Sequence, residues 1–231
     1  MDPLVIYICD KPGQYQAELD RQLTAKGIEH LDIRIPNFSW IARIDKTAEI
    51  CEQYPDRTIF AVDAWDTMLM GEKFELADSR WEQGITFAAQ KRCWPDPIVG
   101  FYDVFWEFKP HSRWRYLNSN PMAGLGKNIA EMIRWGQKVC PLQGNASTCL
   151  DVSGEVCERF YTNIMIRAGR KFNMKIDTRC ELSHTTTDCT AGEIEVSEFR
   201  IRNRVTGSLP IFLHLNGSYQ FSEKLLCAQP V

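Results

Sequence analysis

Two aspartates in the first third of the chain have the spacing of a metal-binding pair. Asp63 and Asp66 belong to the segment DAWD, which directly follows the apolar run TIFAV at 58–62. Carboxylate oxygens at this spacing can converge on one hard divalent cation, and such a cation stabilises negative charge on a diphosphate leaving group. The plainer interpretation, which the sequence leaves open, is that these aspartates cap a helix or close a turn.

A second candidate ligand lies near the end of the sequence. His214 follows an apolar run and is itself followed by Asn216 and Gly217. A neutral imidazole is a good ligand for ions such as Mn²⁺, although a histidine on an apolar strand is also commonly a core residue. The other histidines have polar neighbours, and we expect them on the surface: His30, His111 and His184.

Two further segments have residues suited to a binding cleft. Glu155 and Glu158 are spaced to lie on one face of a helix, where they either point into a cleft or are solvated. The segment RYLNS at 115–119 contains Asn118 and Ser119 and is followed by a turn-forming stretch, NPMAG. Small and turn-forming residues there either let the backbone approach a ligand or join a strand to a helix.

The first half of the chain alternates strand and helix patterns, which must position these residues. Apolar runs predict strands at 4–9, 28–35 and 58–62. Helical periodicity predicts helices at 15–26 and 46–54, the first of them ended by Gly27. The resulting βαβαβ order predicts a parallel sheet with helices on both faces, in which ligands bind at the carboxyl ends of the strands.

The second half of the chain has weaker patterns. Strands are expected at 85–89, 172–176, 193–205 and 211–215, helices at 124–138 and 156–167, and loops at 93–96 and 140–154. A turn is expected at Thr206–Gly207. Because no repeat, low-complexity tract or linker divides the sequence, residues 1–231 are expected to form a single domain.

The composition excludes several classes of protein. The 231 residues contain 27 Lys and Arg against 30 Asp and Glu, and the net charge of −3 rules out attachment to nucleic acid by bulk charge alone. No apolar run approaches the roughly 18 residues of a membrane helix, so no membrane partner is expected. The opening apolar run has no basic segment before it and predicts a strand rather than a secretory signal, so we expect a cytoplasmic protein.

The cysteines and the missing motifs narrow the chemistry. There are nine cysteines and no CxxC pair, which favours free thiols, with one bridge in the region of Cys140 and Cys157 left open. There is also no GxGxxG after the first strand, no GxxxxGK[ST], no GxSxG and no HExxH. Hydride transfer, P-loop chemistry and serine-nucleophile hydrolysis therefore have no support.

Four segments, taken in order, resemble the glycosyltransferase domain of procollagen lysyl hydroxylases and its stand-alone relatives. They are DAWD after its strand, FAAQ with CWPD at 87–96, RYLNS at 115–119, and HLNG at 214–217; IDTRC at 176–180 is similar to a further family segment. The similarity extends from residue 4 to about residue 220. It implies a GT-A fold, which is an α/β, Rossmann-like mixed sheet with helices on both faces.

The resemblance also implies roles for individual residues. Asp63, Asp66 and His214 would bind Mn²⁺ or Mg²⁺ carrying a UDP-sugar, with UDP-glucose as the expected donor, and the metal would stabilise the departing UDP. Glu158 or Glu155 would orient or deprotonate the acceptor hydroxyl. The residues implied around the donor are Trp65 at the uracil or ribose, Lys46 near the diphosphate, Asn118 and Ser119 at the sugar, and Asn216 and Gly217.

Three departures from the family pattern bear on the substrates. Asn120–Pro121 stands where the family has Gly-Gly, Arg159 replaces an amide, and Gln220 stands where a lysine is expected. Compact stand-alone members resemble phage enzymes that glycosylate hydroxymethylated pyrimidines in DNA. The predicted acceptor is therefore 5-hydroxymethylcytosine in phage DNA, modified in the host cytoplasm.

A DNA acceptor would need basic residues to contact phosphates. The candidates come from two basic stretches, whose plainer interpretation is a solvated face: Arg113, Arg115, Arg200, Arg202 and Arg204. Two alternatives stay open. The acceptor is hydroxylysine or a cell-surface glycan, or the chain is an inactive module that binds a nucleotide sugar.

Overall fold

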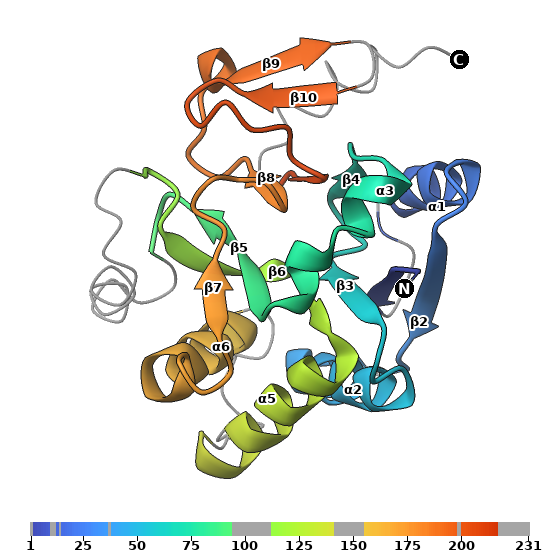
Figure 1. Ribbon diagram of the computed structural model, residues 1–231, viewed down its shortest axis with the longest axis vertical. Helices are drawn as coiled ribbons and strands as arrows, with labels where there is room; N and C mark the ends of the chain where they lie inside the picture. The colour runs from blue at the N-terminus through green and yellow to red at the C-terminus, as the bar shows by residue number, and fades with distance from the viewer. Residues whose placement is uncertain are drawn as a thin grey trace.

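A six-stranded mixed sheet forms the centre of the molecule (Figure 1). The computed structural model describes residues 2–9, 13, 15–36, 38–93, 112–140, 155–197 and 200–216. The sheet has the order β2-β1-β3-β6-β5-β7. Its strands are β1 (Leu4–Cys9), β2 (Glu29–Arg34), β3 (Thr58–Val62), β5 (Ile85–Gln90), β6 (Tyr116–Leu125) and β7 (Met174–Ile176).

Helices lie on both faces of this sheet, as predicted. They are α1 (Gln16–Ala25), α2 (Trp40–Gln53), α3 (Lys73–Leu76), α5 (Gly126–Val139) and α6 (Glu155–Ala168), with short 3₁₀ turns η1 (Ser79–Glu82) and η3 (Ala191–Glu193). Successive side chains of β1 point to opposite faces. Leu4, Ile6 and Ile8 pack with α2, α5 and α6, whereas Val5 and Tyr7 pack with α1, α3 and η1. Burial on both faces explains why β1 is apolar along its whole length.

The βαβαβ opening is confirmed. β1 pairs in parallel with β2 and with β3. The first helix ends before Gly27, whose φ of 61° lies in the left-handed region that glycine adopts without steric cost. The second helix begins at Trp40, six residues earlier than the sequence predicted, because Ser39 caps it by accepting a hydrogen bond from the Ala42 amide at 3.0 Å.

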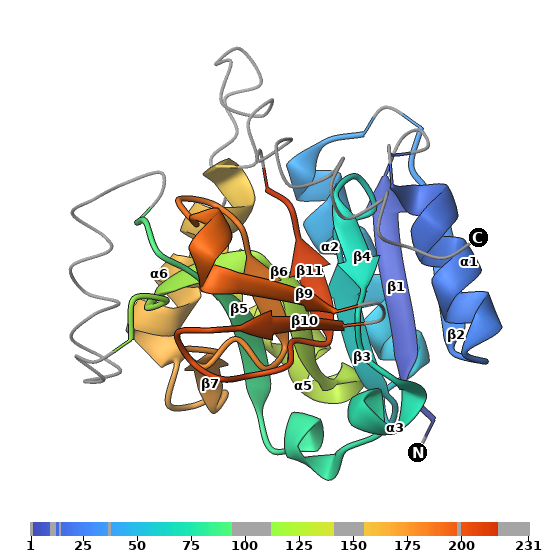
Figure 2. The same cartoon turned by 90° about the horizontal axis from the view of Figure 1, so that it is seen from above.

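A second, three-stranded sheet joins the middle of the chain to its end. Its order is β4-β11-β8, formed by β4 (Thr67–Leu69), β11 (Phe212–His214) and β8 (Ser183–Thr185). β11 is antiparallel to β4, and His214 lies opposite Thr67. A hairpin of β9 (Ile194–Ser197) and β10 (Arg200–Asn203) lies at the top of Figure 1 and in front of the main sheet in Figure 2.

The structure corrects two element predictions. Residues 120–124 do not form a turn before a helix, because they continue β6, and α5 begins at Gly126. The 193–205 segment is not one strand, since β9 ends at Ser197 and β10 runs back beside it.

The pairing of β5 with β6 shifts between Phe87 and Ala88, and this irregularity leaves residues 119–121 out of the ladder. The predicted loops at 94–96 and 141–154 lie outside the described residues.

One side-chain expectation is also corrected. His184 is fully buried rather than on the surface, because it lies on β8, where Asn203 contacts its Nδ1 at 3.0 Å and Trp114 packs on the ring. The expectation of free thiols is confirmed for the described cysteines, and because Cys140 and Cys157 are both free, no bridge joins them. His30 is partly exposed, and His111 lies outside the described residues. Among the described helices, none has the length and apolar character needed to cross a bilayer.

Candidate active site

Asp63, Asp66 and His214 lie together at the carboxyl end of β3. Each offers one ligand atom, and the three atoms lie within 4.8 Å of one another. Asp63 directly follows β3, Asp66 directly precedes β4, and His214 ends β11, which pairs with β4. The pairing of β4 with β11 thus brings together two parts of the site that lie far apart in the sequence.

Electrostatic interactions link the three members of this triad to one another and to Arg43. Asp66 Oδ1 lies 3.2 Å from His214 Nε2, and although burial lowers the pKa of His214, the charge of Asp66 leaves it raised. Burial raises the pKa of Asp63, but the charges of Arg43 and His214 outweigh this and keep it below its ordinary value. The buried Nδ1 of His214 has no hydrogen-bond partner among the described residues. Two carboxylates and an imidazole whose ligand atoms converge fit an ion such as Mn²⁺.

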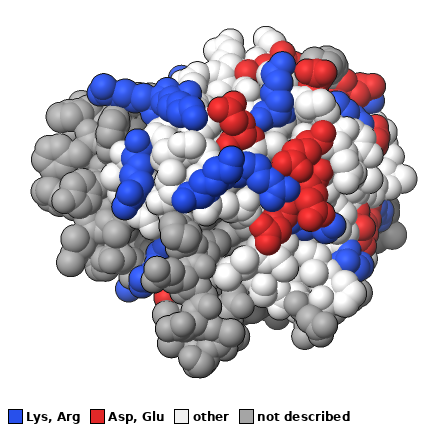
Figure 3. Space-filling view, turned by 90° about the horizontal axis from the view of Figure 1, so that it is seen from below, with Lys and Arg blue, Asp and Glu red and all other residues white. Residues whose placement is uncertain are grey.

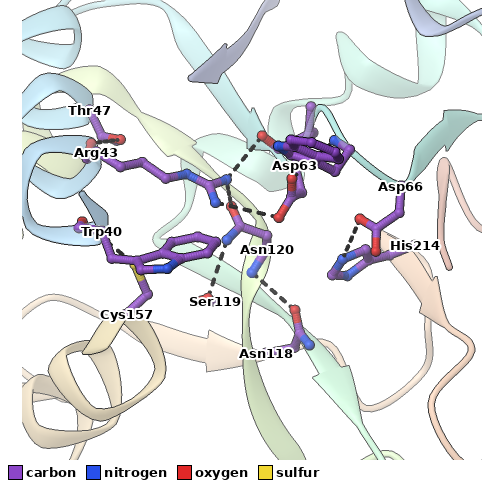
Figure 4. Close-up of polar contacts among 12 residues, drawn as sticks. Trp40, Arg43, Thr47, Asp63, Asp66, Asn118, Ser119, Asn120, Cys157 and His214 are labelled. Carbon is purple, nitrogen blue, oxygen red and sulfur yellow. Dashed lines mark hydrogen bonds and ion pairs between the residues drawn. The ribbon is translucent and has the colours of Figure 1, made fainter. Parts of the chain in front are cut away.

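Arg43 is a site residue that the sequence analysis missed. Its side chain is 7% exposed, and its guanidinium lies 3.4 Å from Asp63 Oδ2 and donates to the carbonyl oxygen of Val62 (Figure 4). The signal in the sequence is its position in α2, where Arg43 falls on the same helix face as Thr47 and next to Ile44, both buried. An arginine on the buried face of a helix requires an anion nearby.

A cavity of about 340 Å³ opens beside the triad. Its walls come from α2, β5, β6, α6 and the segments after β8 and β11. The residues that line it are Trp40, Asp63, Asp66, Gln90, Arg92, Asn118, Ser119, Asn120, Glu158, Thr187, His214 and Asn216. A polar cavity with few apolar walls suits a charged, hydroxyl-rich ligand better than an apolar one.

Glu158 lies in the wall of this cavity, whereas Glu155 does not line it. The Ser119 amide donates to both Glu158 oxygens, at 2.9 and 3.1 Å, and the Ser119 hydroxyl donates at 3.1 Å. These bonds fix a carboxylate that is only 6% exposed. Glu155 instead faces Arg159 at 3.8 Å.

The predicted donor-binding residues differ in whether they line the cavity. Asn118, Ser119 and Asn216 line the cavity. Trp65 lies between the two aspartates, with 41% of its surface exposed, and its amide donates to Asp63 Oδ1 at 3.1 Å. Lys46 is not in the cavity wall. It lies about one helical turn after Arg43 in α2 and pairs with Glu49. Gly217 lies outside the described residues.

The structure does not gather the five candidate DNA-binding arginines at the cavity. None of them lines it. Three face carboxylates: Arg113 lies 3.2 Å from Glu193, Arg200 lies 2.8 Å from Glu75, and Arg204 lies 3.8 Å from Glu195. Arg115 lies over the Tyr116 ring, and Arg202 is exposed on β10.

On a different face, the described basic and acidic side chains lie near one another. Figure 3 looks at the side that α2, α5 and α6 cover, where Lys and Arg alternate with Asp and Glu. The pairs there include Arg134–Glu52, Lys127–Asp56 and Lys171–Glu131. Among the described residues, therefore, neither this face nor the cavity wall shows the basic stripe that nucleic-acid binding usually uses.

The α/β sheet with helices on both faces and the carboxylate pair at the end of a buried strand are consistent with a glycosyltransferase domain of the GT-A type. The family model described as "PLOD GT domain" matches residues 41–226, and the chain belongs to this family. The match covers both aspartates, His214 and the rest of the cavity wall except Trp40.

Two kinds of curated relative are similar to the chain. The uncharacterized protein R699 of Acanthamoeba polyphaga mimivirus is 25% identical over 174 residues, which is 75% of this chain and 32% of that protein. The human multifunctional procollagen lysine hydroxylase and glycosyltransferase LH3 is 26% identical over 177 residues, covering 72% of this chain and 22% of that protein. The rat protein of the same name is 24% identical over 182 residues. The chain thus spans a third or less of the length of these relatives.

Proposed function

We propose that this chain transfers a sugar from a UDP-sugar, with UDP-glucose as the donor, to a hydroxyl group, using a divalent cation held by Asp63, Asp66 and His214. The observation that supports this proposal is the convergence of these three ligands beside a polar cavity of about 340 Å³. Membership of a family of glycosyltransferase domains supports the reaction class. A bound cation supplies Lewis-acid stabilisation of the diphosphate leaving group.

The chain's own residues have separate tasks on the donor side. Asp63 and Asp66 direct carboxylate oxygens toward one point, and His214, at the end of β11, contributes the third ligand atom. The exposed ring of Trp65 offers a flat surface for stacking against the uracil or the ribose. Asn118 and Asn216 present side-chain amides to the cavity, where they can hydrogen-bond sugar hydroxyls.

Glu158 is the residue that we propose to orient or deprotonate the acceptor hydroxyl. It is the candidate glutamate that lines the cavity, and its carboxylate is fixed by Ser119. A fixed carboxylate beside a cavity can accept the proton that the hydroxyl loses as the new glycosidic bond forms. Glu155 has no comparable position, since it faces Arg159 on the outer side of α6.

The acceptor proposals differ in what supports them. The 5-hydroxymethylcytosine hypothesis depends on arginines that would contact phosphates, and three of the five face carboxylates instead. A hydroxylysine acceptor is supported by the human relative, which is named a procollagen lysine hydroxylase and glycosyltransferase. We therefore place hydroxylysine ahead of DNA as the acceptor to test first.

The experiment measures donor use before acceptor use. The protein is incubated with UDP-glucose and Mn²⁺, and release of UDP and free glucose is followed without an acceptor, with Asp66→Asn as the control. A hydroxylysine peptide, duplex DNA containing 5-hydroxymethylcytosine and a glycan are then added separately, and the products are weighed by mass spectrometry. Mn²⁺-dependent turnover that Asp66→Asn lacks supports the proposal. Binding of UDP without turnover on any acceptor or donor would instead support the inactive-module alternative.

A further inference from the structure

Arg43 lies unusually far from the carboxylate that it faces. Its Nη1 is 3.4 Å from Asp63 Oδ2. Charge-assisted hydrogen bonds between a guanidinium and a carboxylate are usually about 2.7–2.9 Å long. Both groups are largely buried, so their attraction is weakly screened and would close this gap unless other contacts resisted it.

Three contacts hold the guanidinium where it is. Nη2 donates to Asn120 Oδ1 at 2.9 Å and to the Val62 carbonyl oxygen at 3.2 Å. The ring of Trp40 lies against the guanidinium, 5.2 Å from Cζ to the ring centroid. The shortest of these contacts is the one to Asn120, which lies in the segment of β6 that leaves the ladder (Figure 4).

Hydrogen bonds to two neighbouring residues of β6 hold Asn120 in place. Its backbone N–H donates a hydrogen bond to Asn118 Oδ1 at 3.1 Å. Its side-chain Nδ2 donates to Ser119 Oγ at 3.2 Å, and Ser119 donates to Glu158. The chain of contacts therefore runs from Asp63 through Arg43 and Asn120 to Glu158, which joins the cation side of the cavity to its opposite wall.

We propose that Asn120 is a positioning residue that holds the Arg43 guanidinium back from Asp63, so that the Asp63 carboxylate stays available to a cation. This inference rests on the proposed function, because it concerns the same metal site. A guanidinium in full contact would occupy the oxygens of Asp63 and compete with the cation. At 3.4 Å it still offsets the charge of the buried carboxylate without closing on it.

The test is a double-mutant cycle read out as the affinity for Mn²⁺ alone, measured by the electron paramagnetic resonance signal of free Mn²⁺. Asn120→Ala should weaken Mn²⁺ binding by roughly three- to tenfold, because the freed guanidinium can close on Asp63. In the Arg43→Gln background, the same change should alter the affinity by less than about twofold. Asn120→Asp, which keeps an acceptor for Arg43, should bind Mn²⁺ at least as tightly as the wild type.

Two controls keep the outcome clear. Arg57→Gln removes an arginine that also donates to backbone carbonyls and lies over an aromatic ring, but at the other end of β3, and it should leave the Mn²⁺ affinity unchanged. Thermal midpoints show whether each variant folds. If Arg43→Gln does not fold, Arg43→Lys replaces it, because a single ammonium cannot reproduce the fork that contacts Asn120 and Val62.

Two results would contradict two different claims, the positioning role of Asn120 and the cation site itself. An Mn²⁺ affinity that Asn120→Ala leaves unchanged, or weakens equally in both backgrounds, contradicts the positioning role while the metal site stands. If Asp66→Asn binds Mn²⁺ as tightly as the wild type, the cation site of the proposed function is wrong, and the role of Asn120 falls with it.

Discussion

The Asp66 side chain faces His214 at 3.2 Å and is 27% exposed, so a change there alters the metal site more than the fold. Asp66→Asn should weaken Mn²⁺-dependent UDP binding by at least about a hundredfold, because an amide oxygen carries no charge to hold the cation. The thermal midpoint without metal should move by less than about 3 °C. Calorimetric titration of UDP with and without Mn²⁺ measures the first quantity.

A matched control for this change is Asp56→Asn. Asp56 is an exposed aspartate that pairs with Lys127 at 3.3 Å, away from the cavity. The Asp56→Asn protein should bind UDP and Mn²⁺ as the wild type does. An Asp66→Asn protein with unaltered metal dependence would remove Asp66 from the ligand set.

Glu158 and Glu155 make a second pair for comparison at the residue scale. Glu158→Gln should lower kcat by roughly 10²- to 10⁴-fold, since an amide cannot take the acceptor proton. Glu155→Gln should stay within about twofold, because its partner Arg159 lies outside the cavity wall. Steady-state rates with acceptor, together with UDP affinity, distinguish a chemical role from a binding role. Equal losses in the two variants would contradict the assignment of Glu158.

At the scale of elements, the loop between β3 and β4 is packed against a neighbouring backbone. A Cβ on Gly13 would lie 2.5 Å from the Ala64 carbonyl oxygen and 2.6 Å from Trp65 Cα. Both contacts are to backbone atoms between Asp63 and Asp66, so the loop has to shift to make room. Gly13 therefore allows the close approach that keeps the two carboxylates in place.

Gly13→Ala should weaken Mn²⁺-dependent UDP binding by about tenfold, because small displacements of ligands are costly for metal binding. Its control is Gly192→Ala, where an added Cβ has no neighbour within 4 Å among the described atoms. Titration of both variants with UDP and Mn²⁺ measures the difference. Wild-type affinity in Gly13→Ala would show that the loop tolerates the shift.

At the scale of the whole molecule, the second sheet contains a buried histidine that affects stability. Burial, and then the nearby charge of Lys91, lowers the pKa of His184 to about 4. The unfolded chain takes up a proton near pH 6.5, whereas the folded protein does so near pH 4. The free energy of unfolding should therefore fall as the pH drops from about 6.5 to about 4, by roughly 3 kcal/mol.

His184→Asn tests this, because the amide keeps an acceptor for Asn203 and does not titrate. Urea unfolding from pH 7 to pH 4 should show a steeper loss of stability in the wild type than in the variant. Asp177 works in the opposite direction, since burial raises its pKa to about 6 and it therefore favours the folded state as the pH falls. It is present in both proteins and cancels in the comparison. Parallel pH profiles would contradict the role of His184.

The sequence by itself determined the first three strands, both helices between them and the position of the aspartate pair. These features depend on neighbouring residues: a doubly buried strand must be apolar throughout, and Gly27 and Pro55 lie directly beyond two of the helices. Asp63 follows β3 wherever that strand lies, so its place at a carboxyl end could be predicted from local pattern alone.

Tertiary structure decided how the rest of the site is assembled. His214 reaches Asp66 because β11 pairs with β4, and Arg43 of α2 reaches both Asp63, after β3, and Asn120, in β6. The irregular pairing of β5 with β6 positions Ser119 for its bonds to Glu158. Each contact joins segments far apart in the chain, and its stability comes from burial and pairing between whole elements, which no local sequence pattern records.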